Sequence, residues 1–227
     1  MQLMRRFLKE NSLSIFFLVL FLAALAGQAI AGHADFNEQA IRHGDPEMSL
    51  SRYVLSSEFG VDVMENWQSE YLQFTLLVVT TVWLLQRGSP ESKELDKAGR
   101  ETDEQQKVGK YAQQNSPRWA KVSGIRRTIY ENSLLLVMGT IWLGTWFAQS
   151  VAGLAQYNSD RLDHHLDTVG WLSYLGRPDF WNRTLQNWQS EFLAVGSMAI
   201  LAVYLRQRGS PNSKPVGAPH TSTGVEG

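Results

Sequence analysis

Four stretches of the chain are almost purely apolar, and polar segments separate them. Leu13–Ala31 runs for 19 residues without a formal charge, and Leu134–Gln156 is similar. Such runs match the roughly 30 Å hydrocarbon layer of a bilayer. Two shorter stretches reach spanning length when they are extended back to Trp67 and Trp188, because tryptophan suits the headgroup level. The pattern predicts an all-α integral membrane protein with four spans, at about residues 13–31, 67–86, 134–155 and 188–206.

The chain also repeats itself with a constant offset of 121 positions. The string Asn-Trp-Gln-Ser-Glu at Asn66–Glu70 returns at Asn187–Glu191, and a Gln-Arg-Gly-Ser-Pro string returns at the same offset. No gap is needed to align residues 5–93 with residues 126–214. Because a repeat governs the fold, we expect two tandem helical hairpins of two spans each. The predicted parts are a first hairpin at 1–93, a cytoplasmic polar linker at 94–125, a second hairpin at 126–214 and a disordered tail at 215–227.

The N-terminus allows two interpretations. Residues 5–9, Arg-Arg-Phe-Leu-Lys, are similar to a shortened twin-arginine export signal, and Ala29–Ala31 fits a signal-peptide cleavage pattern. The repeat favours retention of the helix, because similar strings recur at Arg126-Arg127 and at residues 148–152, where no signal peptide operates. We therefore expect the first span to remain part of the protein.

Lysine and arginine are distributed unevenly among the segments between the spans. The two ends and the central segment 86–133 hold sixteen of these residues, whereas the loops at 32–65 and 156–187 hold five. The positive-inside rule then places both termini and the central linker in the cytoplasm, so the two loops face outward. The two hairpins share one orientation, so we expect a pseudo-two-fold axis along the membrane normal.

The two outer loops contain apolar residues at helical spacing. Trp171, Leu172, Tyr174 and Leu175 fall on one helical side, and the first loop has an equivalent cluster around Tyr53. This spacing favours short amphipathic helices at the outer interface. An ordinary loop that carries a few aromatic residues is the alternative.

Polar side chains recur at equivalent positions in the outer part of the spans. An amide in hydrocarbon must find partners, since an unpaired polar group there costs several kcal/mol. A carboxyl group at that depth is a functional-site hypothesis, although it can also reach the interface or close inter-helix hydrogen bonds. The candidate polar intramembrane site consists of Gln28, Ser69, Glu70, Gln149, Ser190 and Glu191.

A second candidate group lies at the cytoplasmic ends of the hairpins. Glu10 precedes the first span and Arg87 follows the second, and Glu131 and Arg208 are their equivalents. The ends of a two-helix hairpin lie side by side, so Glu10 to Arg87 and Glu131 to Arg208 are predicted ion pairs. Pairs near an interface contribute modestly to stability, so they indicate architecture and no catalysis.

The composition and the short motifs exclude several chemistries. Cysteine is absent, which excludes disulfides and thiol catalysis. The net charge of −1 gives no reason to expect a nucleic-acid partner. None of the five histidines forms a His-x-x-x-His or Glu-x-x-His pattern, so we predict no metal site. Nucleotide-binding loops and hydrolase motifs are missing too, and no cofactor is predicted.

The duplicated Glu-Asn-Ser, Asn-Trp-Gln-Ser-Glu and Gln-Arg-Gly-Ser-Pro strings resemble a bacterial family of small membrane proteins known only as a domain of unknown function. The resemblance covers about residues 5–214, and the Asn-Trp-Gln-Ser-Glu string carries it best. It implies a bacterial inner-membrane protein, and it supplies no activity, ligand or catalytic residue.

Three classes of function follow from these observations. The leading hypothesis is a non-enzymatic membrane protein that acts as an envelope component or binds a partner, either another membrane protein or a second copy of the chain, within the lipid bilayer. The second is a small transporter or channel whose polar cavity is lined by the duplicated Gln and Glu residues. Four spans are few for a carrier, so transport would require an oligomer. A membrane enzyme ranks third, because no catalytic constellation is visible.

Overall fold

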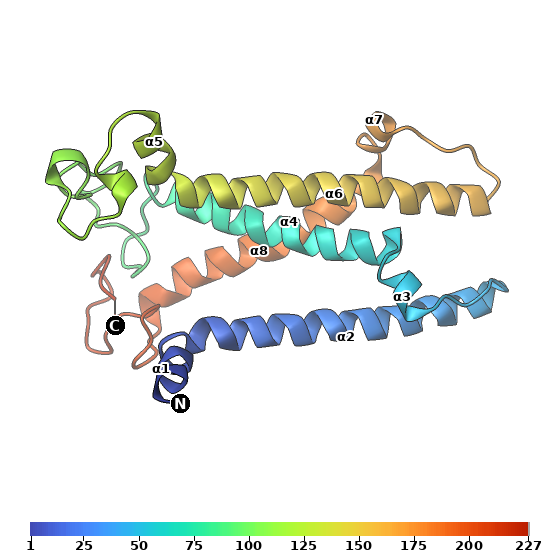
Figure 1. The fold of residues 1–227 in the computed structure, drawn as a ribbon, viewed down its shortest axis with the longest axis horizontal. Helices are drawn as coiled ribbons and strands as arrows, with labels where there is room; N and C mark the ends of the chain where they lie inside the picture. Colours follow the sequence, from blue (N-terminus) through green and yellow to red (C-terminus); the bar gives the residue numbers. More distant parts are fainter. Residues whose placement is uncertain (227) are drawn as a thin grey trace. The chain divides into compact units, whose positions relative to one another are not determined.

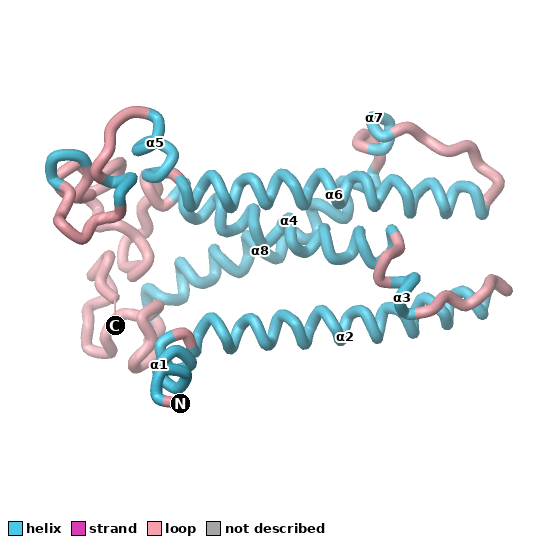
Figure 2. The backbone as a smooth tube through the Cα atoms, in the orientation of Figure 1, coloured by secondary structure: helices cyan, strands magenta, loops and turns pink. Residues whose placement is uncertain are grey.

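The computed structural model describes residues 1–226, and every regular element in that range is helical, with no strand (Figure 1 and Figure 2). The all-α prediction is confirmed. The α-helices of this range are α1 (Gln2–Glu10), α2 (Ser12–His43), α3 (Leu50–Tyr53), α4 (Ser57–Thr80), α5 (Ile125–Glu131), α6 (Ser133–Asp163), α7 (Trp171–Tyr174) and α8 (Pro178–Tyr204), and the linker holds two 3-10 turns, η1 (Gly109–Tyr111) and η2 (Arg118–Ala120).

Helices of the two halves of the chain correspond closely at the offset of 121 residues. The short helices α3 and α7 coincide in full, and α2 and α6 begin at equivalent serines. The joints before those serines also match: Asn11 has φ −116° and ψ 16°, and Asn132 has φ −114° and ψ 12°. The local backbone therefore repeats with the sequence. The division into two hairpin domains stays a prediction.

The chain forms two compact units whose boundaries differ from those of the sequence repeat. Unit 1 contains residues 1–63 and 152–168, and unit 2 contains residues 64–151 and the chain from Val169 onward. Each unit is therefore described by itself.

Unit 1 is organised around Tyr53, which is 3 % exposed. Its ring lies 5.8 Å from Phe36 and 5.6 Å from Phe59, measured between centroids. Gly32 on α2 leaves room for this tyrosine, because a Cβ atom there would overlap with its hydroxyl group. The predicted short helix in this loop is thus present as α3, and a buried aromatic ring anchors it.

Unit 2 is built on α4, α6 and α8. A Cβ atom at Gly139 of α6 would lie 3.9 Å from Thr75 of α4, so these antiparallel helices pack closely there. The α7 turn is tied to this framework, since the indole N–H of Trp171 donates to Ser150 Oγ at 2.9 Å. The ring of Trp146 on α6 lies against those of Phe180 and Trp188 on α8, with centroids 6.2 and 5.6 Å apart.

Two of the described helices, α2 and α6, are long and apolar enough to cross a membrane. At 1.5 Å per residue the 32 residues of α2 extend about 48 Å, so the helix continues well past the predicted end of the span at residue 31. Helices α4 and α8 do not meet the same criterion. Both carry charged and amide side chains in their first halves, and α4 ends at Thr80, six residues before the predicted end at 86.

The segments that follow α4 and α8 fold into the same turn. The backbone N–H groups of Gln86 and Gln207 each donate to a serine Oγ six residues later, both at 2.9 Å. Gly88 and Gly209 have φ of 84° and 81°, a region that favours glycine. The C-terminal segment, predicted as a disordered tail, packs on the first of these turns, where the N–H of Gly88 donates to Thr223 Oγ1 at 2.9 Å.

Candidate functional site

The two copies of Asn-Trp-Gln-Ser-Glu face each other in unit 2, one on α4 and the other on α8 (Figure 1). The indole N–H of Trp188 donates to Gln68 Oε1 at 2.8 Å. The hydroxyl of Ser69 donates to Glu191 Oε1 at 3.3 Å. The paired positions are 120 and 122 residues apart, so the two helices meet almost in the register of the repeat.

The two copies differ in burial. Gln68 is 0 % exposed and Ser69 is 1 % exposed. Their equivalents Gln189 and Ser190 are exposed, and the hydroxyl of Ser190 donates to the carbonyl of Asn187 in its own helix. The copy on α4 therefore faces the centre of unit 2, and part of the copy on α8 faces outward.

The carboxylates of Glu70 and Glu191 complete this cluster. Glu70 is exposed and Glu191 is half-buried. Glu191 accepts the hydrogen bond from Ser69, and Glu70 follows Ser69 directly on α4.

Gln149 is placed differently from the prediction. It is 1 % exposed, and neither its amide oxygen nor its amide nitrogen has a hydrogen-bond partner within residues 1–226. The indole nitrogen of Trp142, seven residues earlier on the same face of α6, lacks a partner in that range too. Ser69 and Ser190 bond elsewhere, and Gln28, half-buried, belongs to unit 1. The structure thus brings together Ser69, Glu70 and Glu191 of the predicted site.

A polar network that the sequence did not reveal lies near the N-terminus of α8. Arg183 lies 3.5 Å from both Glu65 on α4 and Asp179 on its own helix. The hydroxyl of Tyr174 donates to Asp179 at 2.9 Å. Burial raises the pKa of Tyr174, and the hydrogen bond to Asp179 raises it further. The available signal was the i, i+4 spacing of Asp179 and Arg183.

The acidic residues of the predicted cytoplasmic clamps use other partners. Glu10 pairs with Arg6 at 2.6 Å, and Glu131 pairs with Arg127 at 2.7 Å, each within one helix. No ion pair joins Glu131 to Arg208 in the part of the chain that the structure describes, and Arg87 and Arg208 are exposed. An i, i+4 partner lies close at hand along the helix, whereas the predicted pairs require two separate segments to meet.

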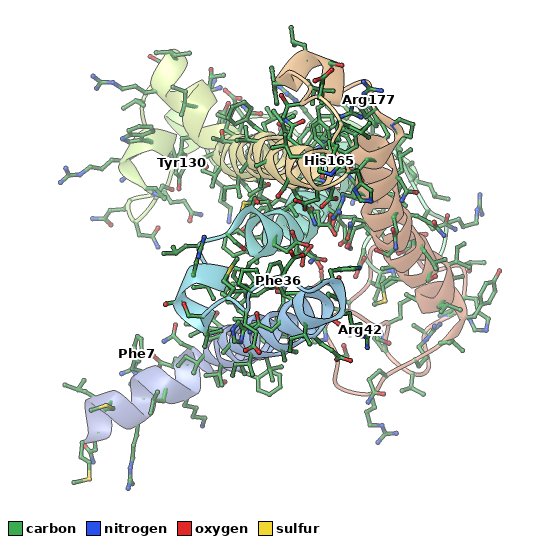
Figure 3. All side chains as sticks on the ribbon, turned by 90° about the vertical axis from the view of Figure 1, so that its right-hand side faces the viewer. Phe7, Phe36, Arg42, Tyr130, His165 and Arg177 are labelled. Carbon is green, nitrogen blue, oxygen red and sulfur yellow. The ribbon has the colours of Figure 1, made fainter. Side chains whose placement is uncertain are left out.

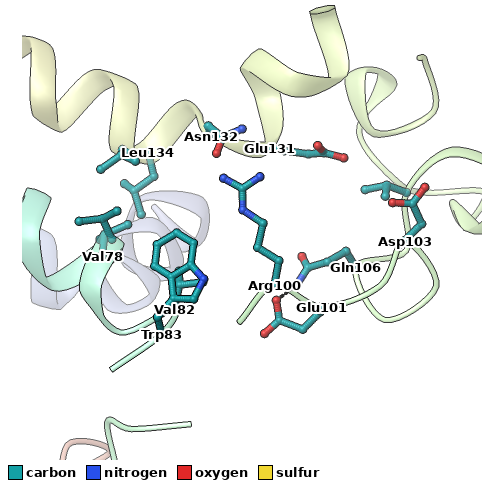
Figure 4. Close-up of a pocket in the computed structure, with 13 residues that line it drawn as sticks. Val78, Val82, Trp83, Arg100, Glu101, Asp103, Gln106, Glu131, Asn132 and Leu134 are labelled. Carbon is teal, nitrogen blue, oxygen red and sulfur yellow. Dashed lines mark hydrogen bonds between the residues drawn. The ribbon is translucent and has the colours of Figure 1, made fainter. Parts of the chain in front are cut away.

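Several cavities lie in unit 2 outside the duplicated motifs, and two of them adjoin the long helices. One, of about 450 Å³, lies where α4 ends and α6 begins, and the linker forms its other wall (Figure 4). The other, of about 260 Å³, is an apolar cavity near the α7 turn, and its walls include the rings of Trp146, Phe147 and Trp181.

The chain belongs to the family described as domain of unknown function DUF6766, whose model matches residues 4–225. Comparison with the curated proteins and with the solved structures gives no match.

Proposed function

We propose that this protein is a four-span protein of the bacterial cytoplasmic membrane, with both termini in the cytoplasm, and that it acts without catalysis by binding a partner protein of the envelope. The surface of α2 carries this proposal. No residue in the bilayer-length apolar window of α2 is buried, and Phe17, Leu18 and Leu22 are all more than half exposed. An apolar surface of this extent requires lipid or a partner to cover it.

The short helices that precede α2 and α6 support a position at the membrane surface. In α1, Leu3, Phe7 and Leu8 form one exposed apolar face, from which Phe7 projects in Figure 3. Basic residues occupy the opposite face. The equivalent helix α5 exposes Ile125 and Ile129. A basic amphipathic helix with exposed apolar residues suits the interface of a membrane whose inner leaflet is anionic.

The pairing of α4 with α8 supports their inclusion as the other two spans. In hydrocarbon, polar groups must be satisfied inside the protein. The Trp188–Gln68 and Ser69–Glu191 hydrogen bonds do this for Gln68 and Ser69 of α4. The same pairing argues for a binding protein over a transporter, because these side chains are engaged with one another.

A transporter is the second candidate, and two observations favour it. The buried amide of Gln149 has no hydrogen-bond partner within residues 1–226, and the carboxylates of Glu70 and Glu191 belong to the same polar cluster as Ser69. In an oligomer, these groups would line a polar path.

Cysteine labelling tests the membrane arrangement, because the native chain has no cysteine. In intact cells, an impermeant thiol reagent should label Asp45→Cys and Asp167→Cys on the outer side. Glu104→Cys should react only after lysis. Labelling of Glu104→Cys in intact cells would overturn the topology.

Crosslinking in cells tests the binding function. A photoreactive residue at Phe17 or Leu22 should give discrete protein adducts, whereas one at Leu72, which is 3 % exposed, should give none. Adducts with lipid alone would overturn partner binding through this face. The wild type can also be tested for solute flux in reconstituted vesicles. Flux that is lost in the Glu70→Gln/Glu191→Gln variant would overturn the binding function in favour of transport.

A further inference from the structure

The cavity between the end of α4 and the start of α6 has one apolar wall and one polar wall (Figure 4). Val78, Val82, Trp83 and Leu134 form the apolar wall. Trp83 and Leu134 are 51 % and 56 % exposed, so this wall continues onto the outer surface of the helices. The cavity has a volume of about 450 Å³, which is within the range of small-molecule sites.

The polar wall separates opposite charges. Arg127 lies 2.9 Å from Asp103 and 2.7 Å from Glu131, so two carboxylates share one guanidinium and a negative charge remains. Glu101 pairs with Lys93 at 2.5 Å, and the hydrogen bond from that lysine lowers the pKa of Glu101. The charges of Glu101 and Lys93 therefore cancel.

Arg100 is the unbalanced cation of this wall. It makes no hydrogen bond or ion pair with any other residue in the 1–226 range, and Figure 4 shows its guanidinium extending into the space between Trp83 and Asn132. A guanidinium with five free donors suits a phosphate group, which it can contact through two parallel hydrogen bonds.

We propose that this cavity binds the headgroup of a zwitterionic phospholipid from the cytoplasmic leaflet. The phosphate binds Arg100, and the ammonium group binds the carboxylates of Asp103 and Glu131. The acyl chains follow the apolar wall at Trp83 and Leu134 toward the bilayer. The inference rests on the proposed membrane position, which puts the C-terminal end of α4 and the N-terminal end of α6 at the inner membrane surface.

Two features distinguish this ligand from others of related chemistry. A free phosphate would use Arg100 but would leave the apolar wall without a partner. A phospholipid with a purely anionic headgroup would place no positive charge beside Asp103 and Glu131, which carry one negative charge beyond Arg127. The zwitterionic lipid offers a phosphate to Arg100, an ammonium group to Asp103 and Glu131, and acyl chains to the apolar wall.

Lipid binding to the full-length protein in detergent tests the proposal. Native mass spectrometry should show retained phosphatidylethanolamine in preference to phosphatidylglycerol. Arg100→Gln should weaken this binding by about tenfold, the typical effect of losing a charge-assisted hydrogen bond. The matched control is Arg118→Gln, another exposed arginine of the linker that does not line the cavity, and it should bind like the wild type.

A second variant tests the ammonium half of the site. Asp103→Asn combined with Glu131→Gln should abolish the preference for phosphatidylethanolamine over phosphatidylglycerol, and circular dichroism should show an intact helical fold. Unchanged binding by Arg100→Gln, or equal binding of the two lipids by the wild type, would overturn the proposal. Displacement of the lipid by millimolar inorganic phosphate would overturn it in favour of a free anion.

Carbonate extraction separates this inference from the proposed function. If wild type and Arg100→Gln both stay in the membrane fraction while lipid binding is unaffected by the substitution, only the lipid site fails. If carbonate releases both proteins, the membrane arrangement fails and the lipid site fails with it.

Discussion

The two copies of Asn-Trp-Gln-Ser-Glu have the same five residues but make different contacts. On α4, Gln68 and Ser69 are buried and bond to the other helix. On α8, Gln189 and Ser190 are exposed, whereas Trp188 and Glu191 make the bonds to α4. One copy contributes its middle residues to the contact, and the other contributes the residues on either side of them.

The difference shows that the neighbours of a repeated segment decide how it is used. Under exact two-fold symmetry the Ser69–Glu191 bond would have a mate between Ser190 and Glu70. Ser190 donates to the carbonyl of Asn187 in its own helix, as Ser69 does to that of Asn66, but within residues 1–226 it makes no bond to Glu70. On α8, Thr184 is fully buried and accepts a bond from the indole of Trp146 on α6 at 3.4 Å. Since that side of α8 faces α6, the Ser190 side remains exposed.

Substitution of the two equivalent glutamines should give the largest contrast between the copies. Gln68→Ala should lower the free energy of unfolding by about 3 kcal/mol, because it leaves a cavity and an unpaired indole N–H on Trp188. Gln189→Ala should change it by less than about 0.5 kcal/mol, as for an exposed side chain. Reversible unfolding in mixed detergent micelles measures both values. Equal losses would show that the two copies contribute equally to the stability of the folded protein.

The sequence predicted the helical class correctly, but α2 and α4 end at other positions than the predicted spans. Helix α2 continues to His43 because residues 32–43 are polar but contain no proline, and the next glycine, Gly44, ends the helix in a left-handed conformation. Helix α4 ends at Thr80, within a run of β-branched residues that have low helix propensity. Hydropathy marks where a chain is apolar, and backbone propensity decides where its helix ends.

The candidate site was predictable only where the repeat itself created the contact. The proximity of Ser69 to Glu191 follows from two equivalent helices that meet in register. The amide of Gln149 has no partner within residues 1–226, and Arg100 lies beside the end of α4. Both arrangements depend on how separate segments pack, and no spacing in the sequence encodes them.

The equivalent tyrosines of α3 and α7 extend the comparison with a smaller expected effect. Tyr174→Phe should lower the free energy of unfolding by about 1–2 kcal/mol, because Asp179 loses a hydrogen bond to a charged acceptor. Tyr53 is held mainly by ring contacts with Phe36 and Phe59, so Tyr53→Phe should cost less than about 0.5 kcal/mol. Thermal unfolding in detergent measures the difference. A larger loss for Tyr53→Phe would contradict this assignment.

The same tyrosine predicts a pH dependence with a definite sign. Burial and Asp179 raise the pKa of Tyr174 in the folded protein above its ordinary value of about 10. Above that pH the unfolded chain loses the proton first, so the folded state binds more protons and stability falls as pH rises. Wild type should therefore lose stability above pH ~10, and Tyr174→Phe should lose less over the same range. Parallel curves for the two proteins would rule out this contribution from Tyr174.

The equivalent serines give the smallest effect and the sharpest test of the asymmetry. Ser69→Ala should cost about 0.5–1 kcal/mol, since its hydroxyl also bonds to Asn66 in its own helix and only the bond to Glu191 crosses between helices. A double-mutant cycle with Glu191→Gln isolates that bond and should give a coupling energy of about 0.5 kcal/mol. The cycle of Ser190→Ala with Glu70→Gln should give a coupling near zero. Coupling of similar size in both cycles would mean that the helices exchange between two symmetry-related pairings, and the difference between the copies would then be an average over both.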